Sequence, residues 1–192
     1  MIKTDNFSKV EIKSSGELRK WLSKNHVQEE AIWLVTYKKN VTQNYVSKDD
    51  VLDELICFGW IDGIRRKLDD QRTMQLISPR RVQHWAKSYK DRANKLIEEK
   101  RMHKSGLDSI KKGKKSGLWN FMDDVDKLII PQDLKIALEK QKGAFEFFDN
   151  INDSSKRFVL RWIKLAKTEK TRINRINKIS KLSSNGEKLP GS

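Results

Sequence analysis

Arginine and tryptophan residues that could bind an anion cluster between Trp60 and Trp85. Five of the six lysine and arginine residues in this span are arginines, although lysine is the commoner of the two in the whole chain. Arginine is favoured where a carboxylate or phosphate must be held in a fixed geometry, because its planar guanidinium donates parallel hydrogen bonds. We therefore predict an anion pocket with two tryptophan walls and an aspartate that orients an arginine. Its candidate residues are Trp60, Asp62, Arg65, Arg80, Arg81 and Trp85.

The same residues also fit a purely structural interpretation. The two tryptophans would then pair in the core, and Asp62 would hold Arg65 or Arg80 in a salt bridge, since buried ion pairs often only fix architecture. A third interpretation is an enzyme that acts on a phosphorylated or carboxylated small molecule, with Asp62 as the base and the arginines as clamps. Because the sequence shows no nucleophile–base pair, we assign no catalytic residue and favour a protein that is not an enzyme.

Metal and cofactor chemistry finds little support in the sequence. There are three histidines, at His26, His84 and His103, and one cysteine, without the spacing of a structural zinc site. The segment Gly113–Ser116 resembles the end of a phosphate loop but lacks the glycine-rich lead and the preceding strand. We therefore expect no metal ion and no cofactor. Cys57 has apolar neighbours, so we expect it to be buried in a protein of a reducing compartment.

The positive charge of the chain supports an alternative function. The 192 residues have a formal net charge of +15, with +10 in residues 61–120, −4 in residues 121–154 and +9 in residues 155–192. Clustered positive charge can neutralise phosphates, so the stretches 65–115 and 156–181 could bind nucleic acid. The candidate residues for this alternative are Arg66, Arg72, Lys87, Lys90, Arg161, Arg172 and Arg175. No recognised nucleic-acid motif accompanies them, and a lysine-rich surface also serves solubility.

Apolar patterns predict strands in the N-terminal half. The run Ala31–Tyr37 is apolar at both parities, which predicts a central strand that is buried on both faces. Gly59–Gly63 predicts a tight turn, and Ile64–Leu68 with Arg72–Ile77 predicts a β-hairpin. We expect an α+β fold with a small antiparallel sheet of about three strands, packed with helices, and a helical C-terminal half.

Capping residues and periodicity predict the helices. One helix begins after Ser14 or Ser15 and another after Ser47, because serine caps helix N-termini. Pro131 at a first helical position predicts a helix that continues through Phe148.

The predicted elements also suggest how the chain is organised. Residues 1–83 form an α+β portion with the central strand and hairpin, and residues 84–183 a helical portion packed on it in one continuous globular unit. Residues 184–192 form a flexible tail. Neither a secretory signal nor an apolar run that could span a membrane occurs, so we expect a cytoplasmic protein. An anionic small molecule, a protein partner or nucleic acid would be its ligand, and the sequence does not define an oligomeric state.

Several short motifs occur together as they do in one known family. They are Cys57–Gly63, Asp69–Arg72, Ser78–Arg81, Trp85–Lys87, Arg101-Met102, Gly106-Leu107, Arg161–Ile163, Ala166-Lys167 and Thr171-Arg172. In these motifs the chain resembles the YdeI/OmpD-associated (OmdA) family of bacteriocin-protection proteins, over about residues 14–183. The resemblance implies a protective or stress-response protein that binds an anionic ligand or partner through the arginine and tryptophan residues. The segment Trp85–Tyr89 departs from the family's Trp-Ser-Lys-x-Asn and lacks its serine and asparagine side chains.

Overall fold

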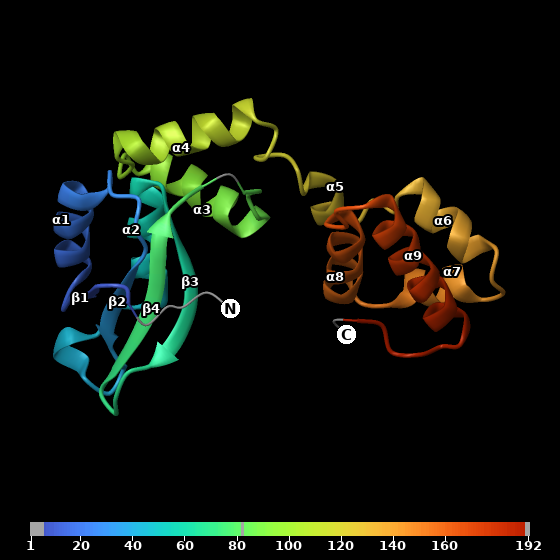
Figure 1. The fold of residues 1–192 in the computed structure, drawn as a ribbon, viewed down its shortest axis with the longest axis horizontal. Helices are drawn as coiled ribbons and strands as arrows, with labels where there is room; N and C mark the ends of the chain where they lie inside the picture. The colour runs from blue at the N-terminus through green and yellow to red at the C-terminus, as the bar shows by residue number, and fades with distance from the viewer. Residues whose placement is uncertain (1–5, 82, 191–192) are drawn as a thin grey trace. The chain divides into compact units, whose positions relative to one another are not determined.

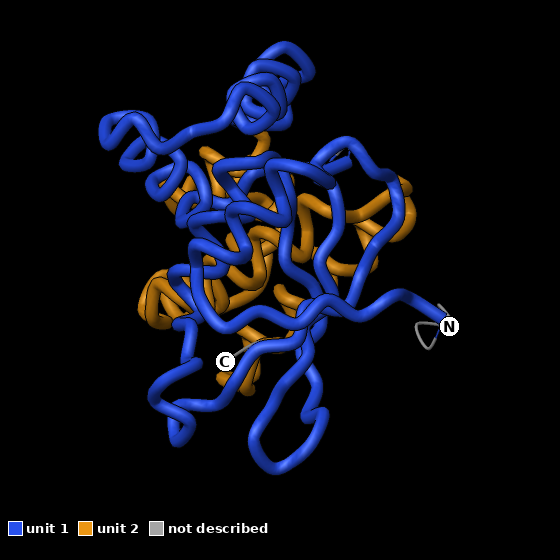
Figure 2. Tube along the Cα trace, turned by 90° about the vertical axis from the view of Figure 1, so that its left-hand side faces the viewer, with its two compact units in different colours: residues 1–120 blue, residues 121–192 orange. Residues whose placement is uncertain are grey.

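The computed structural model describes residues 6–81 and 83–190. The chain folds into two compact units, residues 1–120 and residues 121–192, which are coloured separately in Figure 2. The first unit is built around a β-sheet, and the second is built from helices (Figure 1). The fold is therefore α+β, as the sequence predicts. Within the described residues, no helix has both the length and the apolar character needed to cross a bilayer.

The first unit contains a four-stranded sheet with the order β1-β2-β4-β3. Its strands are β1 (Lys9–Glu11), β2 (Ile32–Tyr37), β3 (Trp60–Lys67) and β4 (Arg72–Pro79). The strand β1 pairs in parallel with β2, whereas the β2–β4 and β3–β4 pairs are antiparallel. The predicted hairpin is β3–β4, and the predicted central strand is β2, which is buried on both faces. The fourth strand, β1, has three residues and is too short to show an alternating pattern in the sequence.

The chain turns from α2 (Lys48–Phe58) into β3 more tightly than the sequence predicts. Gly59 alone makes the turn, with a φ of 75° that residues with a side chain rarely adopt. The next residue, Trp60, already pairs with Pro79 across the sheet. The turn expected over Gly59–Gly63 is therefore wrong, because one left-handed glycine reverses the chain and the strand starts at once.

A bulge interrupts the β3–β4 ladder near its upper end. The pairing shifts between Asp62 and Arg65, so that Gly63 and Ile64 lie opposite one residue of β4. In a regular strand, residues three apart point to opposite faces. Because the bulge adds one residue, Asp62 and Arg65 point to the same face of the sheet. Their side chains both reach Gln75 of β4.

Four helices pack with the sheet in the described part of the first unit, and the starts of the first two follow the predicted serine caps. Ser14 Oγ accepts a hydrogen bond of 3.1 Å from Glu17 N, and Ser47 Oγ accepts one of 3.0 Å from Asp50 N. The remaining elements are α1 (Ser15–Asn25), the 3-10 turn η1 (Thr42–Asn44), α3 (Lys87–Glu98) and α4 (Lys104–Lys115). Their apolar side chains form a core with the sheet that includes Leu18, Leu34, Leu55, Trp60, Ile77 and Trp85.

Helix α4 runs across the upper end of the sheet in Figure 1, where it packs against the end of α2. A Cβ atom at Gly106 would lie 2.2 Å from the carbonyl oxygen of Cys57, so only glycine allows this approach. His103 N donates to Cys57 O at 3.0 Å, and Ser105 Oγ donates to Phe58 O at 2.9 Å. These bonds satisfy carbonyl groups that the end of a helix leaves without partners, and they fix α4 beside the sheet.

The second unit is a group of helices around its own core. Its helices are α5 (Asp123–Asp126), α6 (Gln132–Glu139), α7 (Ala144–Asn150), α8 (Asp153–Lys164) and α9 (Glu169–Ser184). The helix expected from Pro131 through Phe148 is divided: α6 ends at Glu139, and α7 begins after Gly143, which adopts a non-helical φ of 73°. Leu189, which follows α9, is 3% exposed and belongs to this core.

Candidate functional site

A pocket of about 590 Å³ lies in the first unit, between the end of β4 and helix α4. It is lined by three basic residues, Arg80, Arg81 and Lys112, and by three polar ones, Gln83, Ser109 and Ser116. Trp85, Gly113 and Leu118 complete the lining, which contains no acidic residue within the described part of the chain. Three positive charges in a described lining that has no acidic residue favour a negatively charged ligand.

Arg80 is the most constrained of the basic residues. Its backbone N–H donates to Gly59 O at 2.9 Å, which fixes the end of β4 against the turn after α2. Its guanidinium Cζ lies 3.8 Å from the centre of the Trp85 ring and 5.4 Å from that of Tyr89. Burial lowers the pKa of Arg80 to about 10, against the opposing attraction of Tyr89 and Asp62. The side chain therefore remains a cation at neutral pH.

One nitrogen of that cation lacks a hydrogen-bond partner. Nη1 of Arg80 is buried, and no described residue accepts a hydrogen bond from it. Buried polar groups are nearly always paired, and a buried charge is costly unless it is paired. Contact with the Trp85 ring offsets part of this cost. The arrangement leaves a desolvated donor in a residue that lines the pocket.

Trp85, whose ring contacts the Arg80 guanidinium, is itself held firmly in the core. The indole is 2% exposed, and its ring centre lies 4.9 Å from that of Trp119. The backbone N–H of Trp85 donates to Leu118 O at 3.1 Å. A Cβ atom at Gly113 would lie 2.6 Å from Trp85 Nε1, so glycine is needed where α4 crosses the indole. Helix α4 thereby brings Lys112 to the same pocket as Arg80.

Asp62 belongs to a neighbouring hydrogen-bond network. Tyr89 Oη donates to its Oδ1, and Gln75 Nε2 donates to its Oδ2 at 3.1 Å. Arg65 Nη2 donates to Gln75 Oε1 at 2.5 Å, so the amide of Gln75 joins the arginine to the aspartate. No salt bridge links Asp62 to Arg65 or Arg80 in the described residues, contrary to the structural interpretation of the sequence. Burial lowers the pKa of Arg65, and Asp62 opposes this effect.

The structure distributes the six predicted residues over three places. Arg80, Arg81 and Trp85 line the pocket of about 590 Å³. Asp62 and Arg65 line a separate pocket of about 290 Å³. Trp60 is 1% exposed in the core, where its ring meets Trp21 edge-on at 5.6 Å rather than Trp85.

Sequence reasoning missed the residues that complete and support the pocket. Lys112 and Ser109 lie on α4, and Ser116 is the residue that follows it; only the docking of that helix places them beside β4. Tyr89 lies against Arg80 and also holds Asp62, so it connects the two networks. The sequence does single out Tyr89, because this residue replaces the asparagine of the family's Trp-Ser-Lys-x-Asn segment.

Several residues of the nucleic-acid alternative already have partners within the protein. Arg72 pairs with Glu11 at 2.6 Å and Asp69 at 2.7 Å, and Lys87 pairs with Asp91 at 2.6 Å. The guanidinium of Arg66 lies 5.3 Å from the centre of the Trp33 ring. In the second unit, Arg172 pairs with Asp133, and Arg175 donates to the carbonyl of Trp162 and lies over its ring. Lys90 on α3 and Arg161 on α8 also interact within the protein.

The single cysteine offers no reactive group. Cys57 is fully buried, and burial together with the charge of Glu54 raises the pKa of its thiol. A thiol with a raised pKa yields little thiolate, the form that acts as a nucleophile. This confirms the expected burial of Cys57.

Two family models match the chain, one in each unit. A domain of unknown function, DUF8412, matches residues 10–109. The OmdA model, described as bacteriocin-protection, YdeI or OmpD-associated, matches residues 127–186. No curated protein and no solved structure matches. The pocket motifs that suggested the resemblance thus lie within the DUF8412 match, and the motifs of α8 and α9 lie within the OmdA match. The chain belongs to the family of the DUF8412 domain, and its second unit carries the OmdA domain of YdeI/OmpD-associated proteins.

Proposed function

We propose that this YdeI/OmpD-associated protein is a non-enzymatic binding protein that takes up a small polyanion in the pocket of Arg80, Arg81 and Lys112. The observation that carries the proposal is the buried, unpaired Nη1 of Arg80, a residue that lines a pocket whose described lining has no acidic residue. An incoming phosphate or carboxylate oxygen would supply the missing acceptor, and a charge-assisted bond of this kind is among the stronger hydrogen bonds.

The arrangement supports binding more than catalysis. Asp62, the one base suggested by the sequence, lines a different pocket from the basic residues, and both its oxygens accept hydrogen bonds from the protein. A general base must reach the proton that it removes in a bound substrate. An anion held between β4 and α4 would have no such group among the residues that line its pocket.

The biological role that we propose is cytoplasmic and protective. The OmdA description names bacteriocin protection, and this supports a role in defence or stress response for the present chain. A cytoplasmic location is supported by the unpaired, buried Cys57, since free thiols are typical of reducing compartments. The anion would then be the signal or the cargo to which the protective response is coupled.

A thermal-shift experiment on the full chain tests the binding step. Pyrophosphate and citrate are each added at constant ionic strength, with sodium chloride as the reference. A ligand at about 100 times its Kd stabilises the folded state by about 2.7 kcal/mol, so a clear rise in melting temperature is expected. The variants Arg80→Met and Lys112→Ala should lose most of this rise.

The matched control is Lys111→Ala, which removes an exposed lysine of the same helix that does not line the pocket. It should keep the full response to both polyanions. If neither polyanion stabilises the wild type beyond sodium chloride, or if Lys111→Ala loses as much as Lys112→Ala, the polyanion pocket is refuted.

A further inference from the structure

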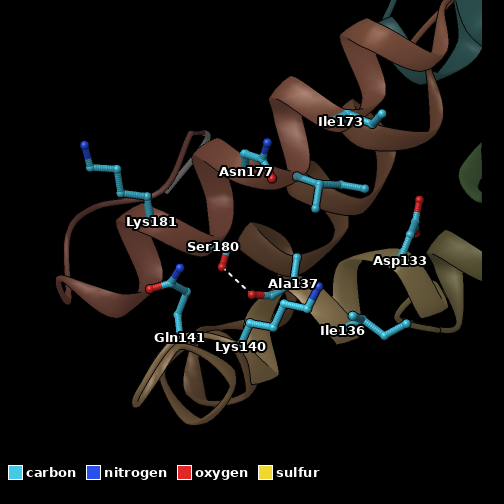
Figure 3. A pocket seen from close by; sticks show the side chains of 10 residues that line it. Asp133, Ile136, Ala137, Lys140, Gln141, Ile173, Asn177, Ser180 and Lys181 are labelled. Atoms are coloured by element: carbon cyan, nitrogen blue, oxygen red, sulfur yellow. Dashed lines mark hydrogen bonds between the residues drawn. The ribbon is translucent and has the colours of Figure 1, made fainter.

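The second unit has a groove of about 370 Å³ between helices α6 and α9, remote in sequence from the anion pocket (Figure 3). On α9 the residues that line it are spaced as one helical face, from Ile173 to Lys181. At a rise of about 1.5 Å per residue, this face is roughly 12 Å long. The groove is thus an open strip along two helices rather than a closed cavity.

Small residues make the floor of the groove and aliphatic residues its sides. Ser180 Oγ donates to Ala137 O at 2.6 Å, which holds α9 close to α6 (Figure 3). Ile136 on α6 is 42% exposed and Ile173 on α9 is 48% exposed. Figure 3 shows both isoleucines toward the same end of the groove. An apolar side chain from a partner would bury both of them together.

The groove also carries positive charge. Lys140 and Lys181 line it, and neither forms an ion pair with a residue that the structure describes. The acidic lining residue Asp133 is already neutralised, because Arg172 donates to it from Nε at 2.6 Å and from Nη2 at 2.9 Å. Helix α9 as a whole has five basic residues and one acidic one. Negative charge on the occupant would therefore be attracted to the groove.

We propose that this groove binds an acidic amphipathic helix of a partner protein. Its aliphatic side chains, spaced three or four residues apart, would pack on Ile136 and Ile173, and Asp or Glu side chains that flank them one to two turns away would pair with Lys140 and Lys181. A second copy of this chain is a poorer occupant, because pairing α9 with α9 would bring two basic helices together. A nucleic acid is also a poorer occupant, because its phosphates would bind the lysines but leave the exposed isoleucines without an apolar contact.

The test uses a labelled model peptide of about 16 residues, since shorter isolated helices are marginal. Leucines form one face and glutamates the flank, and binding to the full chain is followed by fluorescence anisotropy. Saturable binding is expected. Ile173→Ser should weaken it about tenfold, because that change removes an apolar contact worth roughly 1.4 kcal/mol. Lys181→Glu should weaken it further and reduce its dependence on salt.

Matched controls come from the same unit. Ile129→Ser changes an isoleucine that is 55% exposed outside the groove, and Lys178→Glu reverses an exposed charge on α9 that does not line it. Both should bind the peptide as the wild type does. A peptide of the same composition with its leucines distributed all round the helix should bind at least about tenfold more weakly.

Three results would overturn the proposal: equal affinity for the two peptides, an equal loss in the groove and control variants, or no binding by a wild type that circular dichroism shows to be folded. Binding of a single-stranded oligonucleotide with the same sensitivity to Lys181→Glu, but none to Ile173→Ser, would assign the surface to nucleic acid instead. Arg80→Met should leave peptide binding unchanged, so failure here and failure of the anion pocket can be told apart.

Discussion

Replacing Arg80 by methionine should make the protein more stable while it loses its anion site. Burial lowers the pKa of Arg80 to about 10, and at about 1.4 kcal/mol for each tenfold change in proton affinity the buried charge costs the folded state about 3 kcal/mol at pH 7. The cation–π contact with Trp85 returns about 1–2 kcal/mol of this. Methionine is of similar length and keeps an apolar contact with the indole. We therefore expect Arg80→Met to raise the free energy of unfolding by about 1 kcal/mol.

Urea titration followed by tryptophan fluorescence measures this change in the relevant unit. Five of the six tryptophans lie in residues 1–120, so the signal reports mainly on the unit that contains Arg80. The buffer must contain no polyvalent anion, because a bound anion would stabilise the wild type selectively. Arg81→Met is the matched control, since Arg81 is exposed on the same pocket and should change stability by less than about 0.5 kcal/mol.

The difference between wild type and Arg80→Met should also depend on pH. The pKa of Arg80 is lower in the folded state than in the unfolded state, so the unfolded chain binds more protons from about pH 10 upward. The stability of the wild type therefore rises relative to that of the variant as the pH increases through about 10. The stability advantage of the variant should shrink over this range. Lysines and tyrosines titrate in both proteins, so their contributions cancel in the difference.

A loss of more than about 1 kcal/mol in Arg80→Met would refute this reasoning. It would mean that the guanidinium holds the fold together, as the structural interpretation of the sequence requires. An unchanged difference between pH 9 and pH 10.5 would show that burial does not depress the pKa of this arginine.

The other predictions address packing, the thiol and the support of the site. Gly106→Ala should destabilise the protein by about 1–3 kcal/mol in urea, because its Cβ would overlap the carbonyl of Cys57, whereas Gly16→Ala, whose Cβ would meet only Ser14 Oγ at 3.8 Å, should be neutral or mildly stabilising. Cys57 should react with a thiol reagent at pH 8 only after denaturation, and rapid reaction of the native protein would show that the thiol is accessible. Tyr89→Phe should weaken the thermal shift by pyrophosphate, although Tyr89 does not line the pocket, and it would leave that shift unchanged if Tyr89 only fills space.

Local signals in the sequence identify most of the elements but not their boundaries. Serine caps and the apolar run of β2 are local, and they predict α1, α2 and the central strand. The break between α6 and α7 escapes this reasoning, since α6 already ends at Glu139 and α7 starts only after Gly143, whose positive φ is not visible in the apolar pattern. The start of β3 at Trp60 was missed for a related reason, because one glycine suffices where a longer turn was expected.

The anion site is predictable only as far as it is contiguous in the sequence. Arg80, Arg81 and Trp85 lie within six residues of one another, and the end of β4 brings them to one pocket. Lys112 reaches the same pocket because Gly106 and Gly113 let α4 lie against α2 and Trp85. This requirement for close approach is invisible in charge and periodicity, so the third cation could not be placed from the sequence.

The hydrogen-bond partners of Asp62 decide whether Arg80 is available for a ligand. A carboxylate near a buried arginine normally pairs with it, and the protein would then have satisfied its own cation. Here Tyr89 and Gln75 donate to the two oxygens of Asp62, and the bulge lets both Asp62 and Arg65 reach Gln75. The charge of Asp62 still attracts Arg80 through space, which helps to keep the guanidinium protonated, but the donor Nη1 stays unpaired. Tyr89 is therefore a positioning residue: by holding the aspartate, it leaves the arginine to an external anion.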